Sequence, residues 1–121
     1  MHELSIALSL IDMASEEASR HYGARISALH LKLGPMSGVV KEALQFSYEV
    51  ACADTPLQGS QLIIQEIPVV IRCANCQVNE EIDTIQDLRC PKCGELSPDV
   101  IQGRELQLVS LELEQIEEVV T

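Results

Sequence analysis

The sequence predicts an α+β protein in which two helices pack on a small, mainly antiparallel sheet that a cysteine-rich module interrupts. Residues 4–67 alternate between helical and strand periodicity, residues 69–100 hold four of the five cysteines, and strand periodicity returns at 105–114. Hydrophobic residues make up 46% of the chain but aromatic residues only 2%, so we expect an aliphatic core.

The first half of the chain predicts a helix, a strand, a second helix and a second strand. The first helix is expected over 4–22, and leucines alternate with polar residues in a strand at 25–33. The second helix is expected over 39–53 with Ser37 as its N-cap, and a strand follows at 61–67. The predicted buried face of the first helix consists of Leu4, Ala7, Leu8, Ile11, Ala14, Ala18 and Tyr22.

The composition changes at Pro68, which predicts a domain boundary there. Residues 1–68 and 101–121 are expected to form one discontinuous α+β domain, and residues 69–100 a second, metal-binding domain. Cys52 lies apart from the other cysteines on the second helix, where a buried, small apolar side chain is expected.

The formal net charge of −11 excludes whole classes of partner. A chain this acidic gains no counterion-release energy from nucleic acid and is repelled by anionic membranes, whereas metal cations or basic protein surfaces suit it. The sequence shows neither a signal peptide nor an apolar run long enough to span a membrane, so a cytoplasmic location is expected. In that compartment cysteines serve as thiols or metal ligands rather than as disulfides.

Two Cys-x-x-Cys pairs, separated by thirteen residues, predict a structural zinc site in a zinc-ribbon-like module. The expected ligands are Cys73, Cys76, Cys90 and Cys93. Four protein ligands leave no open position for a catalytic water. A redox-active pair is the alternative, but such pairs usually stand alone at a helix N-terminus. Iron of the rubredoxin kind would use the same geometry, and the scarcity of aromatic residues disfavours it.

The two cysteine turns differ in sequence. Cys90-Pro91-Lys92-Cys93 is followed by Gly94, which can adopt the positive φ that such a turn favours, whereas Gln77 follows Cys76, so the first turn is expected to be the weaker one. The module has few large apolar residues, so the metal is expected to supply folding free energy on the order of 10 kcal/mol.

The first three residues, Met1-His2-Glu3, suggest a second metal site. The His2 imidazole, the His2 main-chain nitrogen and the terminal amine of Met1 can close adjacent chelate rings, and the Glu3 amide or carboxylate can complete a square. Nitrogen-rich square-planar sites suit Ni(II) or Cu(II). The alternative is an ordinary solvated terminal histidine.

Together these features resemble the HypA/HybF family of hydrogenase nickel-incorporation proteins over nearly the whole chain. The residues that carry the resemblance are Met1-His2-Glu3, Leu33-Gly34, Ser37-Gly38-Val39, Glu42, Leu44, Phe46, the two Cys-x-x-Cys pairs and Ile101 to Leu106. Some relatives have histidines beside the zinc cysteines. This chain has none there, which argues against a histidine-driven pH switch at that site.

The resemblance implies a non-enzymatic nickel metallochaperone that carries Ni²⁺ as transferable cargo. His2 would be the central nickel ligand with Met1 and Glu3 in the same site, and Zn²⁺ would be structural. The implied partners are a nickel-pathway GTPase of the HypB type and the [NiFe]-hydrogenase large subunit, with urease served in some organisms. A monomer or weak dimer is expected. The alternative functions are a zinc-ribbon adaptor for protein–protein interaction and a thiol oxidoreductase.

Overall fold

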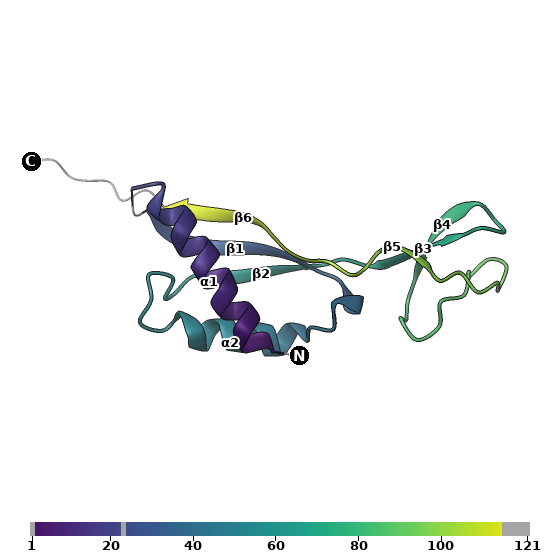
Figure 1. Cartoon of the computed structure of the whole chain (residues 1–121), viewed down its shortest axis with the longest axis horizontal. Coiled ribbons are helices and arrows are strands. Elements are labelled where there is room, and N and C mark those ends of the chain that lie inside the picture. The colour runs from purple at the N-terminus through teal and green to yellow at the C-terminus, as the bar shows by residue number, and fades with distance from the viewer. Residues whose placement is uncertain (1, 23, 115–121) are drawn as a thin grey trace, which may run out of the picture. The chain divides into compact units, whose positions relative to one another are not determined.

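The computed structural model describes residues 2–22 and 24–114, and the contacts among them divide the chain into two compact units. Unit 1 comprises residues 1–31, 40–64 and 108–121, and unit 2 comprises 32–39 and 65–107. In chain order the elements are α1 (Glu3–Ser19), β1 (Arg25–Leu33), a 3₁₀ turn η1 (Pro35–Ser37), α2 (Lys41–Cys52), β2 (Gln61–Glu66), β3 (Val69–Cys73), β4 (Val78–Ile82), β5 (Asp99–Gln102) and β6 (Leu106–Glu114) (Figure 1).

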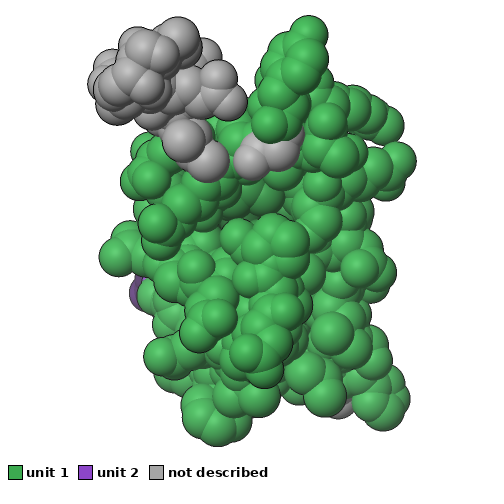
Figure 2. Space-filling view, turned by 90° about the vertical axis from the view of Figure 1, so that its left-hand side faces the viewer, with its two compact units in different colours: residues 1–31, 40–64, 108–121 green, residues 32–39, 65–107 purple. Residues whose placement is uncertain are grey.

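Unit 1 contains both helices, which pack against each other, and a sheet with strand order β2-β1-β6 (Figure 1). Figure 2 shows the surface of unit 1 in green. Ser27 of β1 bonds to Glu112 of β6, and Gly34 just beyond β1 bonds to Glu105 just before β6, so these two strands run antiparallel. The α+β class with two helices and small, mostly antiparallel sheets is therefore confirmed. The core is aliphatic as expected, apart from Tyr48, which is 2% exposed.

Helix α1 differs from the prediction at its end and in its buried stripe. The N–H of Arg20 bonds to the carbonyl of Glu17, which tightens the last turn, and Tyr22 then takes a φ of 60° and is fully exposed. Leu4 and Leu8 are about half exposed, at 52% and 49%, which contradicts their predicted burial. The residues that α1 buries are Ala7, Leu10, Ile11, Ala14 and Ala18.

Helix α2 begins at Lys41, and the predicted Ser37 cap is wrong. Ser37 lies in η1, where its hydroxyl accepts the N–H of Val39 at 3.2 Å, and Val40 holds the N-cap position without a side-chain cap. On the buried face of α2, Leu44 and Tyr48 are joined by Cys52, whose predicted burial is confirmed at 3% exposure.

Unit 2 contains a second three-stranded antiparallel sheet with strand order β4-β3-β5, which the sequence analysis did not foresee. In its register Val69 faces Ile82 and Cys73 faces Val78, so the first cysteine pair lies in the turn between β3 and β4. Unit 2 extends beyond the expected 69–100 because it also takes in residues 32–39, 65–68 and 101–107. The domain boundaries at 68 and 100 stay a prediction about independently folding parts.

The backbone contact at Gly34 explains why residues that precede the cysteines in the sequence belong to unit 2. A Cβ at Gly34 would lie 2.1 Å from the carbonyl oxygen of Gly103, so only glycine allows the two backbones to approach this closely. Within the described residues, no helix has both the length and the apolar character needed to cross a membrane.

Candidate metal sites

The four paired cysteines meet in unit 2, although equivalent members of the two pairs are seventeen positions apart in the sequence. Their Sγ atoms all lie within 4.8 Å of one another. We call this group the cysteine cluster; it consists of Cys73, Cys76, Cys90 and Cys93. Its members range from fully buried, as for Cys73, to exposed, as for Cys93.

The spacing of the sulfurs fits a tetrahedral metal ion. A Zn–S bond of about 2.3 Å places tetrahedral sulfurs about 3.8 Å apart. The Sγ atoms of Cys73 and Cys93 are 3.5 Å apart, and those of Cys76 and Cys90 are 4.0 Å apart. The donor set is therefore preassembled for a thiophilic ion with four ligands.

The two cysteine turns share one backbone geometry despite their different sequences. The N–H of Gln77 bonds to the carbonyl of Cys73 at 2.7 Å, and the N–H of Gly94 bonds to the carbonyl of Cys90 at 2.8 Å. Both residues take a positive φ, 56° at Gln77 and 77° at Gly94. In the first turn, Gln77 thus adopts a left-handed backbone conformation that glycine adopts more readily, because glycine has no Cβ.

The second turn is closed by strand-like pairing on both sides. Arg89 and Leu96 form an isolated antiparallel bridge, and the N–H of Cys90 bonds to the carbonyl of Glu95 at 2.9 Å. This pairing holds the cysteines of the second turn at the ends of a short hairpin, as the β3–β4 connection does for the first.

The thiols of the cluster differ in their acidity. The N–H of Cys76 donates to the Sγ of Cys73 at 3.4 Å, and this bond is the main cause that lowers the pKa of Cys73 to about 6. Hydrogen bonding with Cys93, together with burial, raises the pKa of Cys76 to about 12. One thiol is therefore prepared as a thiolate, the form in which cysteine binds metals.

A basic residue beside the cluster is paired with a carboxylate rather than with sulfur. Lys92 forms a 2.9 Å ion pair with Glu80 of β4, and this contact is the main cause that raises the pKa of Lys92. The ion pair links the second cysteine turn to the sheet of unit 2.

The predicted N-terminal site lies in unit 1. Met1 falls outside the described residues, and His2 is an exposed residue at the N-cap position of α1. The carbonyl of His2 accepts the first helical bond, from Ile6 at 3.1 Å, whereas main-chain N–H groups at a helix start have no acceptor within the helix. The His2 nitrogen and imidazole therefore remain open to a ligand.

Glu3 has a contact that the sequence analysis missed. Its carboxylate accepts the N–H of Val40 at 3.3 Å, which ties the start of α1 to the start of α2. This hydrogen bond is the main cause that holds the pKa of Glu3 below its usual value. No sequence pattern marks Val40, because the contribution comes from its backbone.

The other histidines lie apart from both candidate sites. His21 is 3.4 Å from Glu17 on α1, and His30 of β1 is 3.1 Å from Glu112 of β6. Within the described part of the chain, the cysteine cluster is the single group of three or more metal-ligating side chains that meet at one point.

Fold and site together define a small α+β protein whose second unit carries four cysteines with the spacing of a metal-binding site. The profile of a family described as "Hydrogenase/urease nickel incorporation, metallochaperone, hypA" matches residues 1–113. The chain belongs to this HypA family.

Relatives and solved structures agree with this assignment. The chain is 45% identical over 112 residues to the hydrogenase maturation factor HypA of Chloroflexus aurantiacus, covering 93% of this chain and 98% of that protein. It is 42% identical to the corresponding protein of a Roseiflexus species, covering 94% and 93% of the two chains. The solution structure of the Ni metallochaperone HypA from Helicobacter pylori superposes with a TM-score of 0.62 at 27% identity, covering 93% of this chain and 97% of that one.

Proposed function

We propose that this protein is a nickel metallochaperone that binds Ni²⁺ at its N-terminus and delivers it during [NiFe]-hydrogenase maturation. The observation that carries the proposal is the open position of His2 at the start of α1 in a chain that belongs to the HypA family. A related protein from Helicobacter pylori is described as a Ni metallochaperone.

The donor atoms at the N-terminus support nickel as cargo. The His2 imidazole and main-chain nitrogen can close one chelate ring on a metal ion, and the terminal amine of Met1 can close a second. Nitrogen-rich, square-planar coordination is what Ni(II) prefers. Glu3 is held to α2 by one carboxylate oxygen. A carboxylate accepts more than one contact, so Glu3 can remain tied while it approaches the metal.

The cysteine cluster is proposed to hold structural zinc, because zinc prefers four thiolates in a tetrahedral arrangement and these sulfurs are spaced for it. Zinc would supply folding free energy to unit 2 rather than a reactive centre, since all four positions are filled by protein. The residues of the cluster then act by holding their turns in place. No chemistry by this chain itself is part of the proposal.

The proposed setting follows the family. The chain would work in the cytoplasm, and its partners would be a GTPase of the HypB type and the hydrogenase large subunit, to which nickel is passed. Family descriptions that include urease make a urease client a further possibility to test.

The proposal is tested by calorimetric titration of Ni²⁺ into zinc-loaded protein whose first residue is Met1. Wild type is expected to bind one nickel ion at micromolar affinity, and His2→Ala is expected to lose that binding. His21→Ala is the matched control, because this exposed histidine lies beyond the opposite end of α1, outside the site. A version with two residues added before Met1 separates the amine from the imidazole and is expected to bind weakly.

Each outcome decides between functions. If His2→Ala binds nickel as wild type does, the N-terminal site is wrong. If wild type binds no nickel while retaining zinc, a zinc-ribbon adaptor for protein–protein interaction becomes the better description.

A further inference from the structure

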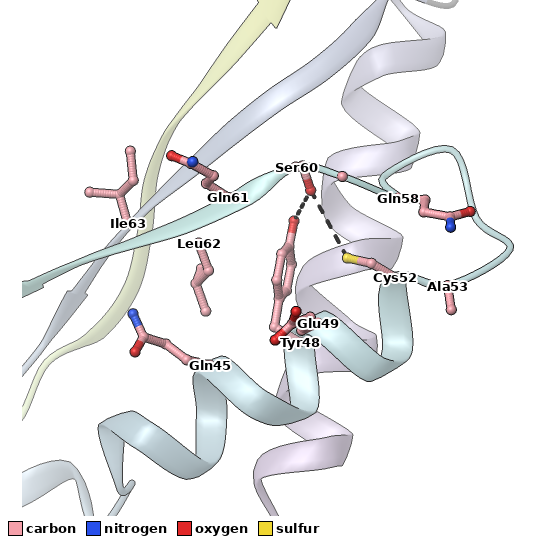
Figure 3. A pocket seen from close by; sticks show the side chains of 11 residues that line it. Gln45, Tyr48, Glu49, Cys52, Ala53, Gln58, Ser60, Gln61, Leu62 and Ile63 are labelled. Carbon is pink, nitrogen blue, oxygen red and sulfur yellow. Dashed lines mark hydrogen bonds between the residues drawn. The ribbon is translucent and has the colours of Figure 1, made fainter.

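A hollow of about 690 Å³ lies in unit 1 between α2 and β2 (Figure 3). Ligand pockets in proteins commonly measure about 300–1,000 Å³, so this hollow has the size of a binding site. Tyr48 and Cys52 line it from the helix, Gln61 to Ile63 line it from the strand, and Ser60 lines it from just before the strand.

The hollow follows the edge of β2 rather than one face of its sheet. Leu62 points toward α2 and is 9% exposed, whereas its neighbour Ile63 points the other way and is 39% exposed (Figure 3). Both nevertheless line the same hollow. Because successive side chains of a strand point to opposite faces, one hollow can reach both only along the strand's backbone edge.

That edge offers hydrogen-bonding groups. In the sheet order β2-β1-β6, β2 has β1 as its one neighbour within the described strands. The N–H of Ile67 points inward, since it bonds to the carbonyl of Leu33 at 2.9 Å. Backbone groups alternate in direction along a strand, so those of Leu62 and Ile64 point away from β1, and Leu62 lines the hollow. An outward row of this kind is a template for another strand.

The polar groups at the back of the hollow already bind one another. The hydroxyls of Tyr48 and Ser60 are 2.6 Å apart, Ser60 also bonds to the carbonyl of Leu57 at 2.6 Å, and the Cys52 sulfur lies 4.0 Å from Ser60 (Figure 3). Burial raises the pKa of Tyr48, so this phenol is neutral at physiological pH. The polar groups at the back of the hollow are thus already hydrogen-bonded to one another. A ligand would therefore be recognised by the strand edge and by the side chains at the rim.

The rim carries negative charge. Glu49 is the one carboxylate among the lining residues, and the amide side chains that also line the hollow are those of Gln45, Gln58 and Gln61. The Arg25 guanidinium lies near Gly59, but Arg25 is not a lining residue. With a formal net charge of −11 over the whole chain, a basic ligand is favoured over an acidic one.

We propose that an extended segment of a partner protein adds to β2 as a further strand and places a Lys or Arg side chain against Glu49. Main-chain bonds to Leu62 and Ile64 would provide affinity, and the exposed Ile63 would contact apolar side chains of the added strand. This surface lies in unit 1 and uses neither His2 nor the cysteine cluster, so it is independent of the proposed nickel function.

The test uses full-length, zinc-loaded, ¹⁵N-labelled protein and eight-residue peptides that alternate Val or Thr with one varied residue: Lys, Gln or Glu. The Lys peptide is expected to shift the amide resonances of 60–64 and of the facing turns of α2. The Glu peptide is expected to bind at least about tenfold more weakly, and a backbone N-methylated Lys peptide, which cannot form a strand ladder, is expected not to bind.

Variants locate the interaction. Glu49→Gln is expected to lower the affinity for the Lys peptide by about two- to fivefold, the range for an exposed charge pair. Glu42→Gln is the matched control, an exposed carboxylate of α2 outside the lining, and is expected to leave affinity unchanged. Ile64→Pro removes an outward N–H and is expected to abolish binding, with retention of the fold checked from the remaining amide spectrum.

Several results would overturn the proposal. They are the absence of any shift at residues 60–64 with all three peptides, equal binding of the Lys and Glu peptides, or binding that depends on Arg25 instead of Glu49. Undiminished binding of the N-methylated peptide would also reject strand addition. Repeating the titration with His2→Ala, where equal affinity is expected, keeps this outcome separate from that of the nickel experiment.

Discussion

The two units bury different kinds of side chain. Unit 1 encloses large aliphatic residues from both helices and the sheet, among them Ile26, Leu29, Leu31, Leu44 and Leu57, each under about 2% exposed. Among the described residues of unit 2, six apolar side chains are buried, and two of these are cysteines of the cluster. These six are Leu33, Val39, Val69, Ile71, Cys73 and Cys90.

This difference shows two ways of specifying a small fold. Burying a large aliphatic side chain contributes about 1.5–3 kcal/mol, and unit 1 collects many such contributions. Unit 2 has four buried aliphatic residues, too few to offset the conformational entropy of its chain without help. A metal bound by the cysteine cluster would be the additional source, worth on the order of 10 kcal/mol in small zinc domains. The following predictions test this comparison, from the largest expected effect to the smallest.

Replacing one ligand of the cluster should affect unit 2 alone. Cys90→Ser is expected to abolish tight zinc binding and to unfold unit 2, since the lost free energy is on the order of 10 kcal/mol. The resonances of α1 and α2 should stay dispersed in a ¹⁵N correlation spectrum. Metal content by mass spectrometry supplies the second measurement.

Cys52→Ala is the matched control for this ligand replacement. Cys52 is buried in unit 1 and lies outside the cluster, so this variant should retain one zinc ion per chain. A Cys90→Ser protein whose unit 2 amides remain dispersed without metal would contradict the view that zinc holds this unit together.

A core truncation in unit 1 should show the opposite pattern. Leu44 is fully buried on α2, and Leu44→Ala is expected to lower the free energy of unfolding by about 2–5 kcal/mol. Urea denaturation followed by helical circular dichroism measures the loss, while zinc content should not change. Phe46→Ala serves as the control on the same helix, since Phe46 is 68% exposed and its removal should cost less than about 0.5 kcal/mol. Equal losses at both positions would show that α2 is not held by its buried face.

The two cysteine turns allow a finer test inside unit 2. Gln77 and Gly94 share a positive φ, and a residue with a Cβ is strained there by about 1–2 kcal/mol. Gln77→Gly is therefore expected to stabilise unit 2 by about 1 kcal/mol and to slow zinc transfer to a competing chelator. Gly94→Ala should do the reverse by a similar amount, and no atom lies within 4 Å of the Cβ it would add, so strain is the only cost. Faster zinc loss from Gln77→Gly would refute the shared-geometry argument.

The sequence predicts well wherever local periodicity or ligand spacing decides the outcome. The strand at Arg25–Leu33 was predicted to the residue, because Leu29, Leu31 and Leu33 alternate with polar residues, and all three leucines are buried. The cysteine cluster was predicted because two Cys-x-x-Cys turns aim their sulfurs at one point, and the structure brings these sulfurs together. Binding of zinc and of nickel at the predicted residues stays a prediction until it is measured.

The sequence-based predictions are wrong where contacts between segments that are distant in the sequence determine the structure. The buried face of α1 contains Leu10 rather than Leu4, because the positions of α2 and the sheet determine which face of α1 they cover. The β3–β5 pairing joins segments almost thirty residues apart and carries a bulge next to Ile71, so alternation within either segment could not reveal it. The bond from Val40 to Glu3 uses a backbone donor that has no sequence signature.

The bond between Glu3 and Val40 yields the smallest expected effect and the one with a defined pH dependence. The pKa of the Glu3 carboxyl is held below 4.5 in the folded protein, chiefly by this hydrogen bond. A carboxyl whose pKa is lowered by folding stabilises the fold fully above its unfolded pKa, and this contribution is lost as the pH falls through the folded value.

The variant Glu3→Gln tests this contribution, because glutamine keeps a hydrogen-bond acceptor but not the charge. The wild type should therefore melt at a slightly higher temperature than the variant at pH 7, and the difference should shrink to zero as the pH falls below 4.5 and through the lower folded-state pKa. Because all other carboxyls are common to both proteins, their titration cancels in this difference. If the difference in melting temperature stays constant over this pH range, Glu3 stabilises unit 1 through packing and not through its charge. The start of α1 would then be stabilised by buried surface area, as the rest of unit 1 is.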